Sequence, residues 1–361
     1  MKIAILGTRG IPNHYGGFEQ FAEQLSVGLV NLGHSVTVYN SNKHPYQERY
    51  FRGVELIHCK DPEDKIGTAG QFIYDLNCIL DSRKKHFDII LQLGYTSSSI
   101  WSRLFPKKSK LITNMDGLEW KRTKFSKKVQ RFLKYAESLA VKHSDHLISD
   151  SIGIQKYIED KYEIKSSYIP YGAHEFNNQD EKQILPYNIL PKSYDILVAR
   201  LEPENSIEII LDGVVKSNSN IDFLVVGNHE TKYGNYLKNK FKLIDNIKFI
   251  GGVYEQEILN NLRYYSRLYF HGHTVGGTNP SLLEAMACSC RICANDNIFN
   301  QSILENDAYY FRNEVDVAKL IDSNKAKEDE MTQNNLNKIV SLYNWKSIIE
   351  QYEQEFYKIL K

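Results

Sequence analysis

The sequence predicts an α/β protein built from two Rossmann-like, doubly wound domains that face a cleft. Its 361 residues exceed what one hydrophobic core usually serves. Short apolar runs alternate with amphipathic stretches along most of the chain, as in parallel sheets covered by helices. The alternation is interrupted over residues 172–191, where Asn, Gln and Pro accumulate. This interruption indicates a linker between two domains.

In the first half, apolar runs of strand length cover residues 2–6, 35–39, 54–58, 89–93, 110–113, 146–149 and 167–169. Helical periodicity covers residues 18–32, 69–83 and 127–142. In the first of these helices, Phe21, Leu25, Leu29 and Leu32 recur on one face. We therefore expect residues 1–172 to form the first domain around a parallel sheet.

The second half repeats the pattern. Strands are expected at residues 194–199, 222–226, 247–250, 268–270 and 291–294, and helices at 206–217, 233–243, 254–265 and 280–287. Beyond Asp307 the chain becomes polar, and apolar periodicity returns between Ile339 and Ile359. Residues 173–342 are the expected second domain, followed by a last helix over about residues 343–361.

The composition is typical of a soluble globular protein, with 42% hydrophobic and 25% charged residues. No apolar run could span a bilayer and no signal peptide precedes the first strand, so the cytoplasm is the expected compartment. Five cysteines, an odd number, argue against a disulfide framework. Cys288, Cys290 and Cys293 lack an obvious fourth ligand, so we interpret them as packing residues rather than a zinc site.

Positive charge is concentrated in residues 1–170, which hold 25 Lys and Arg against 18 Asp and Glu. Ten of these basic residues fall within residues 107–134, where Phe125, Val129, Phe132 and Leu133 recur at roughly helical spacing. The pattern predicts a basic amphipathic helix at an anionic membrane surface. A solvated helix face over ordinary core residues explains it equally well. Nucleic acid is not an expected partner, because the net charge is +1 and no base-reading motif is present.

The most informative segment joins the expected strand at residues 268–270 to a helix that begins at Pro280. Its loop contains Gly276 and Gly277, and its helix carries one acid, Glu284. Glycines let the backbone approach a ligand, and N–H groups at a helix start favour an anion such as a diphosphate. A carboxylate on the same helix can accept hydrogen bonds from a ribose. The segment indicates a nucleoside diphosphate site, although an ordinary strand–loop–helix connection has the same outline.

Another glycine-rich loop follows the first strand, from Gly7 to Gly17. Its spacing differs from the G-x-G-x-x-G of dinucleotide-binding proteins, which disfavours a nicotinamide or flavin cofactor. The pair Gly16-Gly17 before a helix favours backbone amides near a phosphate. In the second half, His271 and His273 flank a glycine, and we interpret them as hydrogen-bonding groups for substrate or loop rather than as metal ligands.

Together these motifs resemble the retaining glycosyltransferases of family 4, which have the GT-B fold. The resemblance covers most of the chain: Gly16-Gly17, and residues 33–38, 169–172, 199–204 and 280–287. Residues 116–120 and 276–281 are similar to the bacterial rhamnosyltransferase-like subgroup of polysaccharide biosynthesis. The resemblance implies that the first domain binds the acceptor and the second binds the nucleotide sugar. It also implies that the last helix packs back on the first domain, anchored by Trp345.

Site residues follow from the same resemblance. The implied donor site consists of Gly16, Gly17, Arg200, Asn205, Gly276, Gly277, Thr278, Asn279, Ser281, Leu282 and Glu284. Glu284 matches the acid that holds the ribose. Arg200 matches the arginine at the diphosphate, where a guanidinium stabilises charge on the leaving group. Asp116, Glu119 and Trp120 are implied to bind the acceptor, and Arg200 and Asp116 to be catalytic.

The chain departs from the family pattern at three positions. The first acid of the E-x7-E motif, which contacts the donor sugar, is Gly276 here. Where the family has a lysine after the diphosphate arginine, this chain has Asn205, so less positive charge supports Arg200. A histidine near the donor sugar is replaced by Asp116, whose carboxylate would orient the acceptor hydroxyl or take its proton. The alternative for Asp116 is a helix cap or a turn residue.

The implied function is retaining transfer of a sugar, with dTDP-rhamnose as the favoured donor and a lipid-linked saccharide as the acceptor. The enzyme would be peripheral at the cytoplasmic face of the plasma membrane and would help to build a capsule, O-antigen or other surface polysaccharide. No cofactor or divalent metal is expected, because no D-x-D pair lies at a strand end. Two other functions stay open: a sugar-nucleotide epimerase of the same fold, and a non-catalytic partner that binds nucleotide sugars.

Overall fold

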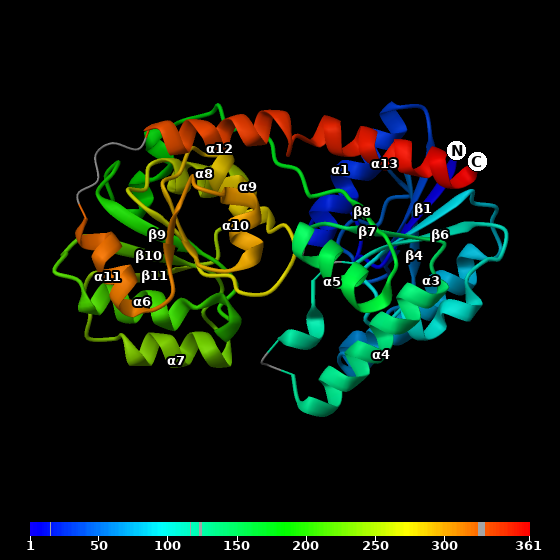
Figure 1. The fold of residues 1–361 in the computed structure, drawn as a ribbon, viewed down its shortest axis with the longest axis horizontal. Coiled ribbons are helices and arrows are strands. Elements are labelled where there is room, and N and C mark those ends of the chain that lie inside the picture. Colours follow the sequence, from blue (N-terminus) through cyan, green and yellow to red (C-terminus); the bar gives the residue numbers. More distant parts are fainter. Residues whose placement is uncertain (15, 116, 123–124, 324–328) are drawn as a thin grey trace. The chain divides into compact units, whose positions relative to one another are not determined.

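The computed structural model describes residues 1–14, 16–115, 117–122, 125–323 and 329–361 (Figure 1). The chain divides into two compact units. The N-terminal unit comprises residues 1–121, 125–171 and 345–361, and the C-terminal unit comprises residues 122–124 and 172–344. Each unit has its own sheet and its own hydrophobic core.

The N-terminal sheet has eight strands in the order β3-β4-β2-β1-β5-β6-β7-β8. They are β1 Lys2–Leu6, β2 Ser35–Ser41, β3 Tyr50–Phe51, β4 Val54–Cys59, β5 Ile89–Leu93, β6 Lys110–Asn114, β7 His146–Ser149 and β8 Ser167–Tyr168. Neighbours pair in parallel, except that β3 runs antiparallel to β4 at the edge. The central strands β1 and β5 are almost entirely buried, as expected for a parallel sheet covered by helices.

The helices of this unit include one from the far end of the chain. They are α1 Gly17–Asn31, α2 Glu63–Ile66, α3 Ala69–Ser82, α4 Lys127–His143, α5 Ile152–Tyr162 and α13 Trp345–Leu360, with 3₁₀ turns at Ser99–Leu104 (η1) and Glu119–Lys121 (η2). Helix α13 packs on α1, where the Phe21 ring lies 5.3 Å from the Tyr352 ring. A Cβ at Gly28 would lie 2.2 Å from Ile349 Cδ1, so the two helices meet at a glycine. Residues 345–361 therefore complete the core of the N-terminal unit.

The C-terminal sheet has six parallel strands in the order β11-β10-β9-β12-β13-β14. They are β9 Tyr194–Val198, β10 Asp222–Val226, β11 Ile247–Gly251, β12 Tyr269–His271, β13 Ile292–Asn295 and β14 Tyr309–Phe311. The helices are α6 Ile207–Lys216, α7 Lys232–Lys240, α8 Gln256–Tyr264, α9 Pro280–Ala287, α10 Ile298–Leu304, α11 Glu314–Asp322 and α12 Asp329–Ser341. Short 3₁₀ turns lie at Glu181–Gln183 (η3), Leu185–Tyr187 (η4) and Pro203–Asn205 (η5).

Both sheets contain a topological switch point. The chain builds each sheet outward from its first strand in one direction and then returns to build the other side. As a result β1 lies beside β5, and β9 lies beside β12, although neither pair is consecutive among the strands. Ligands of open α/β sheets bind outside the carboxyl ends of the strands at such points. The loops after β1, β5, β9 and β12 are therefore where each unit is expected to carry a site.

The predicted fold class of two Rossmann-like α/β domains is confirmed, and the predicted elements agree with the observed ones to within about three residues at either end. Elements missing from the prediction are α2, β3, α5, α10, β14, α11 and α12. The polar segment after Asp307 contributes to the C-terminal core, because Phe311 and Val317 are fully buried there. The segment 172–191 is irregular apart from η3 and η4, but it packs on the C-terminal unit and buries Ile184 completely.

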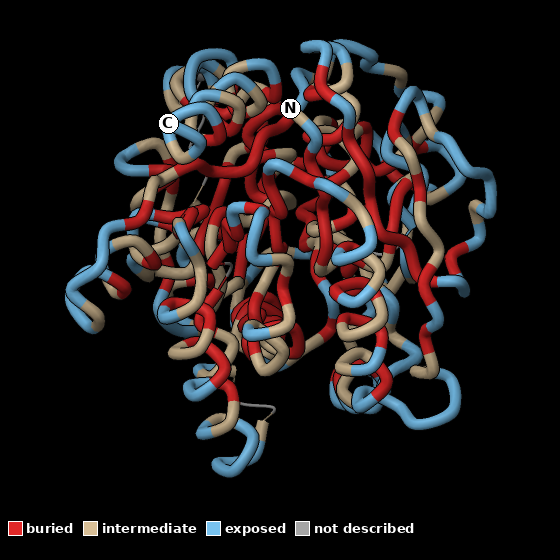
Figure 2. The backbone as a smooth tube through the Cα atoms, turned by 90° about the vertical axis from the view of Figure 1, so that its right-hand side faces the viewer, coloured by how far each residue is buried: buried red, intermediate tan, exposed pale blue. Residues whose placement is uncertain are grey.

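Burial follows the layers of the fold. In Figure 2 the exposed residues lie mainly on outer turns of the trace, and the buried residues lie inside them. Within the described part of the chain, no helix is long and apolar enough to cross a membrane.

Candidate functional site

The loops that leave β9 and β12 lie against each other at the switch point of the C-terminal sheet. Arg200 follows β9, and Gly272 and His273 follow β12. A Cβ at Gly272 would lie 2.1 Å from the carbonyl oxygen of Asn205, so only glycine allows this approach. The close contact brings the segment that carries Arg200 next to the glycine-rich loop that leads into α9.

Asn205 holds the turn that presents Arg200. Its Nδ2 donates to the carbonyl oxygen of Arg200 at 2.7 Å, and the Glu202 N–H donates to the same oxygen at 2.8 Å. The Asn205 residue is buried, whereas Arg200 is exposed. A guanidinium on a fixed turn at the sheet's carboxyl edge can meet an anionic ligand. The structure gives Asn205 this bracing role, and its predicted contact with the donor stays a prediction.

The start of α9 is capped by its own loop. Asn279 is the N-cap, and its Oδ1 accepts from the Ser281 N–H at 2.9 Å. The Leu282 N–H donates to the Asn279 carbonyl oxygen at 3.0 Å, and Pro280 has no N–H. The first amides of this helix are therefore engaged locally, so an anion at this end competes with the Asn279 side chain for them.

Glu284 forms a buried ion pair with an arginine that the sequence reasoning missed. Arg263 of α8 is 1% exposed at its side chain, and its Nη2 lies 2.7 Å from Glu284 Oε2. The same guanidinium donates to Ser281 Oγ at 3.1 Å and to Asn260 Oδ1 at 2.9 Å. The Glu284 side chain is 16% exposed. Arg263 therefore orients an ionised carboxylate that still reaches the surface. The signal in the sequence, one arginine in an amphipathic helix, is too common to be diagnostic.

A second set of contacts ties the β12 loop to the turn after β9. The Thr274 N–H and Oγ1 donate to the carbonyl oxygen of Glu204 at 3.1 and 2.8 Å. The Glu204 side chain is buried, and its Oε1 lies 3.3 Å from Nη1 of Arg122, which groups with the C-terminal unit. Two cationic side chains, those of Arg122 and Arg200, thus lie near the loop that follows β12.

The predicted glycines of the N-terminal unit lie at the start of α1. Gly16 is the N-cap with φ −174°, an extended conformation open to any residue, and Gly17 begins the helix. The Arg9 N–H donates to Glu19 Oε1 at 2.8 Å, which fixes part of the loop between β1 and α1. A Cβ at Gly7, whose φ is +91°, would lie 2.1 Å from the Leu93 carbonyl oxygen. The ends of β1 and β5 therefore also meet through a glycine.

Trp120, a predicted acceptor residue, is held by a buried carboxylate. Its Nε1 donates to Oε2 of Glu137 at 3.0 Å, and Lys134 Nζ lies 4.1 Å from its ring centroid. Lys161 also donates to Glu137, at 2.7 Å. Glu119 and Trp120 belong to η2, while Asp116 lies outside the described residues. The sequence did not single out Glu137, because it is one acidic residue on a basic helix.

A buried carboxyl group of the N-terminal unit was missed as well. Asp75 of α3 accepts a hydrogen bond from Ser97, which follows β5. Burial raises the pKa of Asp75 to about 7. A carboxyl group that titrates near neutrality thus lies at the carboxyl edge of this sheet. Its position on an amphipathic helix gives no signal in the sequence.

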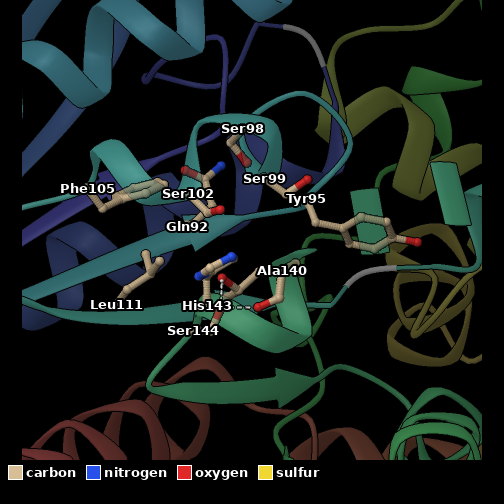
Figure 3. A pocket seen from close by; sticks show the side chains of 11 residues that line it. Gln92, Tyr95, Ser98, Ser99, Ser102, Phe105, Leu111, Ala140, His143 and Ser144 are labelled. Carbon is tan, nitrogen blue, oxygen red and sulfur yellow. Dashed lines mark hydrogen bonds between the residues drawn. The ribbon is translucent and has the colours of Figure 1, made fainter. Parts of the chain in front are cut away.

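A pocket opens elsewhere in the N-terminal unit, between η1, β5, β6 and α4 (Figure 3). Its lining includes Gln92, Ser99 and Ser144, and Ser144 Oγ donates to the Ala140 carbonyl oxygen at 2.8 Å. The space inside it is about 10 Å³, room for about one water molecule, so it cannot hold a sugar or a nucleotide. None of its lining residues belongs to the predicted donor or acceptor sets.

The structure therefore places the predicted residues on two segments of the C-terminal unit and two segments of the N-terminal unit. Arg200 and Asn205 share one turn after β9, and Asn279, Ser281, Leu282 and Glu284 lie on or before α9, which follows β12. Gly276, Gly277 and Thr278 lie in the loop between β12 and α9. Gly16 and Gly17, and separately Glu119 and Trp120, belong to the N-terminal unit.

Two family models match the chain, each over less than half of its length. Residues 1–174 match a domain of unknown function (DUF1972), and residues 186–340 match the Glycosyl transferases group 1. No curated protein matches the chain.

Solved structures share the fold over nearly the whole chain. A sucrose-phosphate synthase from Thermosynechococcus elongatus has a TM-score of 0.82 and 16% identity, covering 99% of this chain and 98% of its own. HepE from Anabaena in complex with UDP and glucose has a TM-score of 0.76 and 16% identity, covering 99% and 100%. WaaG, a glycosyltransferase involved in lipopolysaccharide biosynthesis, has a TM-score of 0.70 and 12% identity, covering 99% of each. At these identities the likeness establishes the fold, which is GT-B.

We expect the substitution Arg263→Ala to lower the free energy of unfolding by about 3–5 kcal/mol, because it removes one partner of a buried ion pair. Arg312→Ala is the matched control in the same unit, since Arg312 is 77% exposed and paired with Asp296. It should cost less than about 1 kcal/mol. Denaturant unfolding followed by circular dichroism measures both. Equal, small losses in the two variants would contradict the assignment of Arg263 as a buried support.

Proposed function

We propose that this chain, whose residues 186–340 belong to the Glycosyl transferases group 1, transfers a sugar from a nucleoside diphosphate to an acceptor hydroxyl with retention of anomeric configuration. The observation that carries the proposal is the placement of Arg200 and Glu284. Arg200 follows β9 and Glu284 lies on the helix after β12, so they flank the switch point of the C-terminal sheet. In the proposal Arg200 meets the diphosphate, and Glu284 accepts hydrogen bonds from the ribose.

The proposed reaction breaks the bond between the anomeric carbon and the diphosphate oxygen, and both electrons leave with that oxygen. Arg200 stabilises the charge that develops on it. The acceptor oxygen forms the new bond on the same face of the sugar, so no protein nucleophile is needed. In the proposal Asp116 orients the acceptor hydroxyl and takes its proton late in the reaction. Catalysis then rests on positioning and on stabilisation of the leaving group.

The two units take different roles in this proposal. The donor binds to the C-terminal unit at Arg200, Asn205, residues 276–279, Ser281, Leu282 and Glu284. The roles of Gly16 and Gly17 at the donor stay predictions. The acceptor binds to the N-terminal unit, where Glu119 and Trp120 form part of its site. The network around Glu137 supports this role for Trp120, because it fixes the indole on a rigid carboxylate.

The finer proposal names the substrates. The motif at residues 276–281 favours dTDP-rhamnose as donor and a lipid-diphosphate-linked saccharide as acceptor, in the assembly of a capsule, O-antigen or other surface polysaccharide. UDP-glucose is the first donor to compare, since HepE holds UDP and glucose.

Helix α4 supports a membrane-surface acceptor. Exposed basic residues line it, namely Lys127, Lys128, Arg131, Lys134 and Lys142. Tyr135 on the same helix is 58% exposed. Phe132 packs on Phe72 of α3, with ring centroids 5.7 Å apart, and Ile73 beside it is 41% exposed. Basic and apolar side chains together suit the cytoplasmic face of an anionic membrane.

The first test measures release of nucleoside diphosphate from dTDP-, UDP- and GDP-sugars, with and without a bacterial lipid-linked saccharide extract. We expect acceptor-dependent release from one donor, dTDP-rhamnose. The release should be unchanged by EDTA, because the proposal assigns the leaving group's charge to Arg200 rather than to a metal. Nuclear magnetic resonance of the product gives the anomeric configuration. Conversion of the donor to an epimer would instead indicate an epimerase, and tight nucleotide binding without turnover would indicate a binding partner.

The ribose assignment is tested with Glu284→Gln, which keeps the volume of the side chain and an oxygen for Arg263. We expect nucleoside diphosphate binding to weaken by about 1–3 kcal/mol, as charge-assisted hydrogen bonds are lost. Glu314→Gln, at an exposed position on α11 of the same unit, should leave the affinity unchanged. Titration calorimetry measures both variants. An affinity equal to that of the wild type would remove Glu284 from the site.

The membrane proposal is tested by sedimentation with vesicles of anionic or zwitterionic lipid. We expect the protein to sediment with anionic vesicles, because each basic residue near such a surface contributes about 1 kcal/mol. The triple change Lys127→Glu, Lys128→Glu and Arg131→Glu should weaken this binding at least about tenfold. Charge reversals at Lys216, Lys248 and Lys319 in the C-terminal unit serve as the control. If the wild type stays in the supernatant, helix α4 is an ordinary solvated helix.

A further inference from the structure

The end of β12 and the loop after it carry two stacked histidines. The ring centroids of His271 and His273 lie 4.4 Å apart, with an angle of 18° between the ring planes. Tyr269 stacks on His271 at 6.3 Å and 20°. His271 is fully buried, and His273 is partly exposed. The three rings form one column, which ends at the switch point beside the turn of Arg200.

Three nitrogen atoms of this pair are buried without a partner. Neither ring nitrogen of His271, nor Nδ1 of His273, has a hydrogen-bond partner among the residues that the structure describes. Buried polar groups are nearly always paired, because an unpaired one loses its water without replacement. Such groups therefore indicate a place that a ligand or an ordered water occupies.

The backbone that carries His273 is fixed from several sides. Its carbonyl oxygen accepts from Asn297 Nδ2 at 3.0 Å and from Asn300 Nδ2 at 3.1 Å. The next residue, Thr274, is held on the Glu204 carbonyl oxygen. The main chain is thus immobilised, while the imidazole has an unsatisfied nitrogen. A rigid backbone under an unpaired side chain is the arrangement of a preorganised binding group.

The two rings are neutral. Burial lowers the pKa of His273 to about 3, and the charges of Arg200 and Arg122 act in the same direction. Burial also lowers the pKa of His271 well below its ordinary value. A neutral imidazole offers one donor and one acceptor, which suits a hydroxyl group. The diphosphate, in contrast, is the natural partner of the guanidinium of Arg200.

The same loop provides space three residues later. Gly276 has φ +135°, and a Cβ built there would meet no atom of the described chain within 4 Å. Gly276 stands where the resemblance places an acid that contacts the donor sugar. The loop therefore lacks a carboxylate at position 276 and presents neutral imidazoles just before it.

We propose that the sugar of the donor binds against the His271–His273 pair, with His273 hydrogen-bonded to a sugar hydroxyl and determining which glycosyl group is accepted. His271 is a positioning residue, which holds the ring of His273 by stacking. The proposal rests on the proposed function, since it names the part of that site that recognises the glycosyl group.

The test compares ligands with and without the sugar. UDP, dTDP, UDP-glucose and dTDP-rhamnose are titrated by calorimetry into the wild type, His273→Ala and His273→Asn. We expect UDP and dTDP to bind all three proteins within about twofold, which also shows that the variants fold. The nucleotide sugar that the wild type prefers should bind His273→Ala at least about tenfold more weakly. His273→Asn should recover part of this loss, because its amide keeps a donor and an acceptor.

His58→Asn is the control, since His58 is a half-buried strand histidine of the N-terminal unit. It should bind all four ligands like the wild type. Equal weakening of nucleoside diphosphate and nucleotide sugar in His273→Ala would overturn the inference, as would unchanged affinity for both. Failure of the wild type to bind any nucleoside diphosphate would overturn the proposed function itself, and this inference with it.

Discussion

The buried ion pair of Arg263 and Glu284 is the interaction on which the rest of the candidate donor site depends. It joins α8 to α9, and the same guanidinium holds Ser281 in the first turn of α9. Ser281 in turn lies 2.9 Å from the hydroxyl of Tyr269, so the column of rings along β12 rests on this helix. A guanidinium without water is tolerable only while its carboxylate faces it ionised. Glu284 is therefore oriented by Arg263 before any ligand arrives.

Around this pair, side-chain amides and a hydroxyl hold the loops by their carbonyl oxygens. Asn205 donates a hydrogen bond to the carbonyl oxygen of Arg200, and Asn297 and Asn300 donate to that of His273. Thr274 donates to the carbonyl oxygen of Glu204. The bonds to Arg200 and His273 leave the side chains of these two residues available for other partners. The loops at the switch point consequently combine irregular backbone with fixed geometry, which is what a site needs when it must discriminate between similar sugars.

The sequence was sufficient for the fold class because strand and helix periodicity alternate clearly in both halves. The prediction missed helices that bury few apolar residues. Helix α5 buries only Ile154 and Ile158, and α11 buries three apolar residues among charged ones. Glu284 and Arg200 could be singled out because motifs surround them. Arg263, Glu137 and Asp75 could not, because each is one charged residue on an amphipathic helix. Their burial results from contacts between elements far apart in the sequence, which a local pattern does not contain.

The placement of α13 has a consequence for synthesis of the chain. This helix completes the core of the N-terminal unit, yet it follows the entire C-terminal unit in the sequence. While residues 172–344 emerge from the ribosome, the ring of Phe21 lacks the contacts that Trp345 and Tyr352 later provide. The first unit to be translated is thus the last to be finished. Throughout that interval the apolar surface that α13 later covers is exposed, and such surface promotes aggregation.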